Sequence, residues 1–292
     1  MKWLVLANPC AGTGNSTRQW HRRLCAELGM PLDMVVTAGP GHATSIAKQA
    51  RGYDGIIIVG GDGTVAEAIQ GMDPATQRLA VMPAGHGNCL ARDLGLGHHA
   101  SALGALRSLR FRRIDLIDIE LEYAHGGVEP RICASTIAVG YVADVASKGR
   151  RRFGALGRYA YALASLLVVP RSLGFTVALE SRERQERRLT GVVINNTRHL
   201  ANFSAFGAAR VDDGLIDVME LSAGWLRQQL HNAAVLFGSR RFGPCRLRQV
   251  QREEWRLADA GRLMIDGEMI DGVRGIVVAC RRAALDCLVA TP

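Results

Sequence analysis

Short apolar runs alternate with segments of helical periodicity through the first third of the chain. The runs are rich in valine, isoleucine and leucine and predict buried strands, while apolar positions at helical spacing predict amphipathic helices between them. This alternation is typical of an α/β domain built on a parallel sheet. The predicted strands cover 3–6, 34–37, 55–59 and 79–82, and the predicted helices cover 16–28, 42–50, a segment from 65 onward, and 100–109.

Polar or glycine-rich loops follow the predicted strands of this first domain. Asn8 and Pro9 follow the first strand, and Thr37 closes the second. Segment 60–64 follows the third strand, and segment 83–85 follows the fourth. Ligands of open α/β sheets bind beyond the carboxyl ends of the strands. We therefore expect these four loops to form a ligand site at one edge of the sheet.

The pattern changes after about residue 113, where strand-like runs replace the helical periodicity. Residues 114–121 alternate apolar with acidic side chains, as in a half-buried strand. Further short apolar runs typical of strands occur at 191–194, 215–219 and 276–280. The second part of the chain is therefore predicted to be rich in β-structure.

Two domains follow from this change of pattern. We predict an α/β parallel-sheet domain over 1–113 and a β-rich domain, of the β-sandwich type, over 114–281. The segment 282–292 is expected to return to the first domain. A helical insertion is expected at 156–169, inside the second domain.

A buried strand that ends in a glycine-rich turn gives the strongest local signal, at Gly60-Gly61-Asp62-Gly63-Thr64. Glycines let backbone amides approach an anion, and the following helix adds unpaired N–H groups and its dipole. Thr64 and Glu67 have the spacing of a capping box. The same turn without any ligand is an equally frequent alternative. Asp62 favours the phosphate site, because a carboxylate there can hold Mg²⁺ or take a proton.

Charge and cysteine content narrow the class of protein only a little. The net charge of +9 and the pI near 9.6 favour an anionic partner, which can be nucleic acid, an acidic membrane surface or a phosphorylated substrate. The seven cysteines form no CxxC pair, so neither a disulfide framework nor a zinc site is indicated, and a reducing cytoplasm fits best.

The two longest apolar segments of the sequence do not predict a membrane span. The apolar start ends at Asn8, too early for a signal peptide, and reads as a first strand. The apolar stretch 159–169 is about half as long as a membrane-spanning helix. We therefore expect a soluble or peripheral protein.

Two familiar nucleotide motifs are excluded. The chain has no GxxxxGK[ST] segment, so it has no P-loop. The turn after the first strand also lacks the GxGxxG spacing of dinucleotide folds, which removes the main support for hydride transfer.

The Gly60–Thr64 turn, together with Asn8, Pro9 and Gly12, resembles the diacylglycerol kinase catalytic domain, which bacterial lipid kinases, sphingosine kinases and ceramide kinases share. The resemblance covers nearly the whole chain. Segment 83–95 resembles the Pro-x-Gly-Thr/Ser-x-Asn loop of the family. His86 stands where the family usually has threonine or serine. Cys89 stands where diacylglycerol kinases commonly have aspartate, and this form of the loop is closer to sphingosine and ceramide kinases.

The resemblance implies an ATP-dependent kinase that phosphorylates a hydroxyl of a membrane lipid. The substrate is expected to be diacylglycerol-like, with a sphingoid base or ceramide as alternatives. ATP and Mg²⁺ are the implied cofactors, and phospholipid biosynthesis is the implied process. The residues implied to contact the nucleotide are Asn8, Pro9, Gly12, Thr37, Gly60, Gly61, Asp62, Gly63, Thr64, Val65, Ala66, Glu67, Gly85, His86, Gly87 and Asn88.

Two later motifs carry the implied metal and base. The segment Arg210 to Leu215 resembles the family's Asp-Asp-Gly-Leu motif, so Mg²⁺ is expected at Asp213 and at the main-chain oxygens of Arg210 and Leu215. Asp266-Gly267-Glu268 resembles the family's Asp-Gly-Glu, which makes Glu268 a candidate general base. Asp62 is an alternative base, because sphingosine kinases assign this role to the aspartate of the Gly-Asp-Gly turn. Asp266 is the third catalytic candidate. Taken alone, both segments read as turns.

Two other functions are alternatives to a lipid kinase. An NAD kinase-like enzyme has a similar glycine-rich turn, and a non-catalytic nucleotide- or nucleic-acid-binding protein would use the excess of arginine. No nucleic-acid-binding motif is present, so no nucleic-acid partner is expected. Arg150–Arg152 with segment 154–161 forms either an edge that rests on an anionic membrane or a solvated charge run. We expect a cytoplasmic protein, peripheral at the inner face of the membrane, with a homodimer left open.

Overall fold

The computed structural model describes most of the chain, in two compact units. One unit comprises Met1–Leu116, Val211–Asp213 and Arg282–Pro292, and the other comprises Ile117–Arg210 and Gly214–Arg281. The described residues are 1–11, 17–85, 87–153, 160–171, 173–178, 184–200, 203–204, 206–222, 224, 226 and 245–290. Gly12, His86 and residues 154–159 lie outside them, and with the last range the start of the expected helical insertion and most of the expected membrane edge 154–161.

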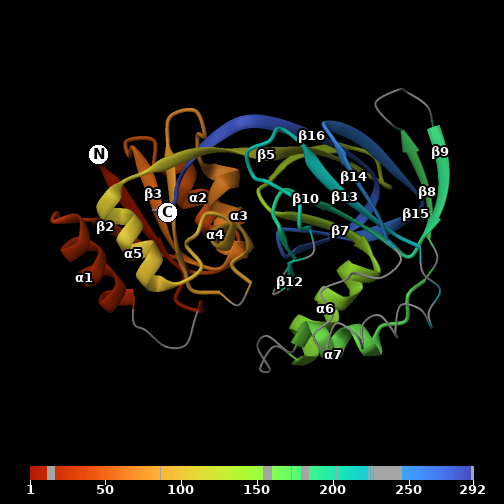
Figure 1. Cartoon of the computed structure of the whole chain (residues 1–292), viewed down its shortest axis with the longest axis horizontal. Coiled ribbons are helices and arrows are strands. Elements are labelled where there is room, and N and C mark those ends of the chain that lie inside the picture. The colour runs from red at the N-terminus through yellow and green to blue at the C-terminus, as the bar shows by residue number, and fades with distance from the viewer. Residues whose placement is uncertain are drawn as a thin grey trace. The chain divides into compact units, whose positions relative to one another are not determined.

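A parallel sheet forms the centre of the first unit (Figure 1). Its strands follow the order β4, β3, β1, β2. Every residue of the two central strands is buried, because each is a continuous apolar run covered on both faces. The strands are β1 (Trp3–Ala7), β2 (Asp33–Val36), β3 (Gly55–Gly60) and β4 (Arg78–Pro83).

Helices connect these strands, as the alternating pattern predicts. Helix α2 packs against α3, and α1 packs against α5. Helix α2, for example, buries Ala43, Ile46 and Ala47. The helices of this unit are α1 (Thr17–Leu28), α2 (His42–Gln49), α3 (Asp62–Gly71), α4 (Cys89–Asp93) and α5 (His99–Ser108).

The predicted capping box at Thr64 and Glu67 is wrong. Helix α3 begins at Asp62, three residues before the expected start, and its N-cap is Gly61, which has no side chain. Thr64 therefore lies inside the first turn. The Glu67 carboxylate instead accepts a hydrogen bond from the backbone N–H of Ala43 on α2, at 3.3 Å.

A short segment far along the chain joins the first unit. The backbone N–H of Asp115 donates to the carbonyl of Val211 at 2.6 Å, and Arg112 pairs with Asp212 at 3.7 Å. The end of β16 (Glu268–Leu288) also lies here, where Cys287 pairs with Leu79 of β4. No local pattern predicts the grouping of Val211–Asp213 with this unit, because these contacts span about a third of the chain.

Antiparallel strands build the second unit, in the order β14, β13, β10, β7, β15, β16, with β5–β6 and β8–β9 as further pairs (Figure 1). The parallel α/β unit and this β-rich unit confirm the predicted fold class. The strands are β5 (Phe111–Tyr123), β6 (Val128–Cys133), β7 (Thr136–Gly140), β8 (Leu173–Ala178), β9 (Arg184–Leu189), β10 (Gly191–Asn195), β11 (His199–Leu200), β12 (Phe203–Ser204), β13 (Ile216–Leu221), β14 (Cys245–Val250), β15 (Arg252–Ile265) and β16.

Two helices lie beside this sheet. Helix α6 (Tyr141–Phe153) packs against β7 and β10, and α7 (Ala160–Leu167) packs against α6 (Figure 1). Helical structure thus begins at Tyr141, well before the expected insertion at 156–169. No helix among the described residues is long and apolar enough to cross a membrane.

A buried charge cluster ties four strands of the second unit together. Arg248 on β14 donates from Nε to Glu220 at 3.1 Å and from Nη2 to Glu253 at 2.6 Å. The indole N–H of Trp255 also donates to Glu253, at 2.8 Å, and Arg187 pairs with Glu220 at 3.2 Å. Burial raises the pKa of the Glu253 carboxyl, and the contacts with Arg248 and Trp255 oppose that rise.

We expect the change Arg248→Met to lower the free energy of unfolding by about 3–5 kcal/mol, because it leaves Glu253 buried without its cation. The loss should be smaller near about pH 5 than near about pH 8, since a lone buried glutamate takes up a proton as the pH falls. Urea denaturation at both pH values measures it. Arg246→Met is the control on the same strand, where the side chain is exposed. Equal losses in the two variants would contradict the prediction.

Candidate functional site

The turn between β3 and α3 presents backbone groups and almost no side chains. The N–H groups of Thr64 and Val65 both point back to the carbonyl of Gly61, at 3.0 and 3.1 Å, which starts the helix. A Cβ atom on Gly60 would lie 2.8 Å from Cβ of Thr64, so only glycine fits there. Gly63 is exposed, and a Cβ added to it would meet no atom within 4 Å. The start of α3 therefore faces open space with the positive end of its dipole.

The loop after β4 lies directly against this turn. The N–H of Ala84 donates to the carbonyl of Gly60 at 2.8 Å. A Cβ on Gly85 would lie 2.6 Å from Cα of Gly61, so the two backbones touch. Gly61 has extended dihedral angles, φ −103° and ψ −173°, so close approach, and not backbone strain, requires glycine there.

Asn88 fixes the shape of the second loop. Its side-chain oxygen accepts a hydrogen bond from the N–H of Gly85 at 3.0 Å, and its amide group donates to the carbonyl of Gly85 at 2.8 Å. Its backbone is left-handed, with φ 48°, a conformation that asparagine tolerates better than most residues. Gly87 lies between these two residues and is half-buried.

Asp62 links the two loops through its side chain. Its Oδ1 accepts a hydrogen bond from the backbone N–H of Cys89 at 2.7 Å. Because Cys89 takes part through its backbone and its side chain is buried, a cysteine at this position leaves the contact intact. The Asp62 carboxylate is therefore held at the junction of both glycine-containing loops.

The turn after β1 joins the same edge of the sheet. The amide group of Asn8 donates to Oγ1 of Thr64 at 2.9 Å, and its side-chain oxygen accepts from the N–H of Cys10 at 2.9 Å. Pro9 is exposed beside it. The N–H of Thr37 donates to the carbonyl of Ala7 at 2.9 Å, and Thr37 is buried. Three of the four predicted loops are thus joined by hydrogen bonds, and Thr37 closes the neighbouring strand.

The remaining residues of helix α3 serve different contacts. Val65 is buried in the core, and Ala66 is half-buried. Glu67 contacts α2 through both its side chain and its main chain, because its carbonyl also accepts a hydrogen bond from Oγ1 of Thr44 at 2.7 Å. These contacts fit a role for Glu67 in holding helix α3 against α2, without direct contact to a ligand.

In the second unit, Asp266 lies in a tight turn between β15 and β16 and is buried. Its carboxylate accepts three backbone hydrogen bonds, from the N–H groups of Ala134, Ser135 and Thr136, at 2.8, 3.0 and 2.7 Å. The thiol of Cys133 approaches it at 3.3 Å. Burial raises the pKa of Asp266, and the backbone donors oppose that rise. With its oxygens so occupied, Asp266 is placed to hold structure more than to accept a substrate proton.

Glu268 lies two residues further on and, unlike Asp266, is exposed. It is the first residue of β16, its side chain is 59% exposed, and its carboxylate lies 3.6 Å from Arg131. The turn that precedes it has positive φ at both central residues, 46° at Asp266 and 91° at Gly267, which suits a two-residue hairpin. The Glu268 carboxylate is thus accessible and fixed at its base.

A cluster of buried polar side chains near Asp266 was not predicted from the sequence. Thr136 donates from its hydroxyl to Asn195, and the amide group of Asn195 lies 3.2 Å from Oγ1 of Thr197. All three side chains are buried. The available signal was the run Asn195-Asn196-Thr197 directly after an apolar strand, which is a polar stretch where burial would otherwise continue.

The expected metal ligands divide between the units. Asp213 belongs to the first unit, whereas Arg210 and Leu215 belong to the second. Gly214 between them has φ 74°, which favours glycine. One carboxylate and two carbonyls are hard oxygen donors of the kind that Mg²⁺ prefers. Within the described ranges, no three histidine, cysteine, aspartate or glutamate side chains gather into a separate metal site.

Solved structures share the architecture. A diacylglycerol kinase from Bacillus anthracis matches with a TM-score of 0.78 at 19% identity, over 100% of this chain and 97% of that chain. Yeast NADH kinase complexed with NADH matches with a TM-score of 0.55 at 10% identity, over 100% of this chain and 84% of that chain. At these identities the likeness shows the fold alone, and it is the fold predicted from the sequence.

Sequence comparisons find related kinases. A diacylglycerol kinase of Mycobacterium tuberculosis is 28% identical over 226 residues, which are 74% of this chain and 72% of that protein. Sphingoid long-chain bases kinase 1 of Arabidopsis thaliana is 27% identical over 187 residues, 58% of this chain and 24% of that protein. Residues 2–119, which carry the joined glycine loops, match the model of the diacylglycerol kinase catalytic domain. Residues 2–119 therefore carry a diacylglycerol kinase catalytic domain, and the chain is a lipid kinase.

Proposed function

We propose that this lipid kinase transfers the γ-phosphoryl group of ATP to a hydroxyl of a diacylglycerol-like membrane lipid. The observation that carries the proposal is the contact between the Gly61 and Gly85 backbones, with Asp62 joined to the N–H of Cys89 beside it. Such a side-chain-free backbone surface at the start of a helix suits a polyphosphate. A sphingoid base or ceramide remains the alternative acceptor.

The nucleotide would lie along the loop edge of the first unit. Backbone N–H groups of the glycine turn before Thr64 would face its phosphates, and Asn8 would fix the adjacent turn through Thr64. Mg²⁺ would be held by Asp213 and by the carbonyl oxygens of Arg210 and Leu215. When bound, it would neutralise part of the phosphate charge.

Phosphoryl transfer needs little covalent chemistry from the protein. The lipid oxygen forms a bond to the γ-phosphorus as the bond from that phosphorus to the bridging oxygen of ADP breaks, and ADP leaves. The proton of the lipid hydroxyl passes to a carboxylate. We assign this role to Glu268, because it is exposed and ends a fixed turn, with Asp62 as the alternative base.

The lipid acceptor implies where the protein works. We propose that it acts in phospholipid metabolism, in the cytoplasm, where it meets the inner face of the membrane through a peripheral contact. A homodimer is compatible with this role and is tested by the mass of the protein in solution.

Transfer of label from γ-³²P-ATP in Mg²⁺ buffer tests the function directly. The acceptors are micellar diacylglycerol, a sphingoid base and ceramide, with NAD as a soluble acceptor. Label on diacylglycerol supports the proposal, and label on a sphingoid base or ceramide moves it to that lipid. Label on NAD alone would contradict the proposed lipid substrate.

We expect Glu268→Gln to reduce kcat by about 100-fold or more, as the loss of a general base does, with little change in the KM for ATP. The folded structure should persist because the side chain is exposed. The matched control is Glu129→Gln, since Glu129 contacts the same Arg131, at 2.7 Å. Equal activity of the two variants would exclude Glu268 as the base.

A further inference from the structure

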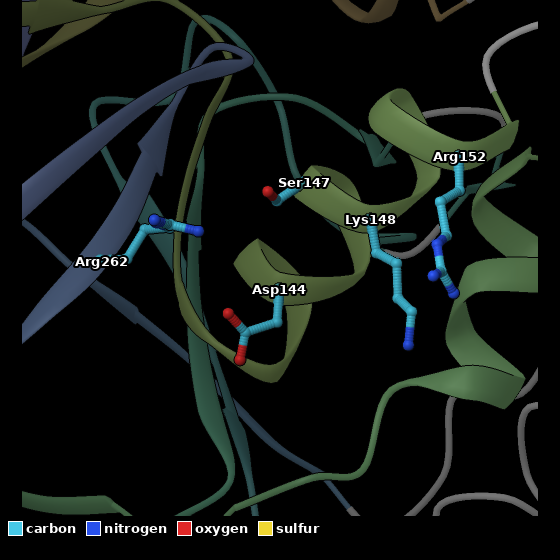
Figure 2. A pocket seen from close by; sticks show the side chains of 5 residues that line it. All are labelled: Asp144, Ser147, Lys148, Arg152 and Arg262. Carbon is cyan, nitrogen blue, oxygen red and sulfur yellow. The ribbon is translucent and has the colours of Figure 1, made fainter.

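A polar cavity of about 370 Å³ opens beside helix α6 in the second unit. Figure 2 shows four of its side chains on α6, with Arg262 reaching toward them from β15. This cationic cavity, as we name it, is lined by Asp144, Ser147, Lys148, Arg152 and Arg262. It contains none of the residues assigned to phosphoryl transfer.

Positive charge dominates the lining, with three cationic side chains against one carboxylate. Arg262 is held in place by Asp271, through hydrogen bonds of 2.5 and 3.3 Å. Partial burial raises the pKa of the Asp144 carboxyl, while Arg262 and Arg171 act in the opposite direction. The cavity therefore favours an anionic ligand, and Asp144 with Ser147 can accept a hydrogen bond from a hydroxyl or protonated phosphate oxygen.

An exposed apolar face adjoins the cavity. The ammonium group of Lys148 donates to the carbonyl of Leu167 at 2.9 Å, which joins the cavity to the end of α7. Leu163, Leu166 and Leu167 on α7 are 40%, 42% and 51% exposed, and Val169 just beyond is 63% exposed. We call these four residues the leucine face. Ala164 and Val168 turn inward and are buried, so the exposed positions belong to the outer side of one helix.

Cationic and apolar groups on neighbouring helices match the two layers of a membrane surface. Lipid phosphates attract lysine and arginine, while leucines enter the boundary between headgroups and acyl chains. A purely solvated charge run would not need the adjoining leucines.

We propose that the cationic cavity binds the phosphate headgroup of an anionic phospholipid while the leucine face enters the same leaflet. The lipid bound here is a neighbour of the substrate and is not phosphorylated. The proposal deepens the peripheral membrane contact of the proposed function by naming its site and ligand. It does not require that the phosphoryl transfer be correct.

Vesicle flotation of the whole protein without ATP tests the proposal, with vesicles of phosphatidylcholine alone or with phosphatidylglycerol. We expect binding only to the anionic vesicles. The variant Lys148→Gln/Arg152→Gln should bind about 30-fold more weakly, since each charge at such a surface contributes about 1 kcal/mol. The control Arg184→Gln/Arg188→Gln removes two exposed arginines of β9 in the same unit and should bind nearly normally.

Further variants separate the outcomes. Arg152→Gln alone keeps the contact of Lys148 with Leu167 and should still weaken binding about fivefold. Leu166→Ser/Leu167→Ser should also lose vesicle binding. Equal weakening by the β9 control would overturn the proposal, as would tight binding of inorganic phosphate by a protein that ignores vesicles. Label transfer to micellar lipid by the Lys148→Gln/Arg152→Gln variant checks the proposed function separately, and we expect it to be retained.

Discussion

The change Asp62→Asn is expected to reduce lipid phosphorylation by about 100-fold or more, while the free energy of unfolding changes little. An amide oxygen can still accept the hydrogen bond that the N–H of Cys89 donates to Oδ1 at 2.7 Å, so the two loops stay joined. The negative charge is lost, however. That charge, beside the glycine turn, is expected to stabilise the transition state, either by holding a cation or by accepting the substrate proton.

Steady-state kinetics with varied ATP and varied lipid measures this effect. Asp54→Asn is the matched control, because Asp54 precedes the opposite end of the same strand, β3, and is exposed. Normal kcat in Asp62→Asn together with an inactive Glu268→Gln would leave Glu268 as the base and Asp62 as a structural link. Normal turnover in both variants would make the proposed mechanism wrong.

The change Asp266→Ala should lower the free energy of unfolding by about 3–5 kcal/mol, since three buried N–H groups lose their acceptor and each unsatisfied group costs about 1–3 kcal/mol. Alanine also tolerates φ of 46° poorly, which adds to the loss. Asp266→Asn should cost less, because asparagine keeps one acceptor oxygen and tolerates this backbone. Denaturation by urea measures both variants.

Asp259→Ala serves as the control for this change, since Asp259 lies exposed on the same strand, β15. At temperatures where Asp266→Asn remains folded, its kcat should fall while its KM for ATP stays near normal, because Glu268 lies two residues away. A stable Asp266→Ala variant with full activity would show that the three backbone contacts neither hold the turn nor position Glu268.

The first unit could be predicted well because its two central strands are continuous apolar runs. The expected strand 55–59 differs from β3 by one residue, and the expected helix 42–50 differs from α2 by one. The start of α3 could not be predicted, because Gly61 caps the helix without a side chain. Helix α4 is too short for periodicity to show it.

The candidate site was predictable as a set of loops but not as a set of contacts. Parallel strands bring their carboxyl ends together, so Asn8 and the glycine turn could be placed at one edge. The hydrogen bond from Cys89 to Asp62 joins residues 27 apart, and those from segment 134–136 to Asp266 span 130 to 132 residues. A hairpin turn with a buried carboxylate has the same local sequence as one with an exposed carboxylate.

The touching backbones of Gly61 and Gly85 imply that the backbone surface proposed to bind phosphate is formed before any nucleotide arrives. No rotamers have to be frozen at this point, because neither residue has a side chain, and each loop limits the motion of the other. Nucleotide association would then lose little conformational entropy here, so more of the contact energy remains as affinity. The same contact makes both positions intolerant of substitution. A methyl group on either residue would push the two loops apart, and neighbouring side chains cannot relieve the clash because it involves backbone atoms.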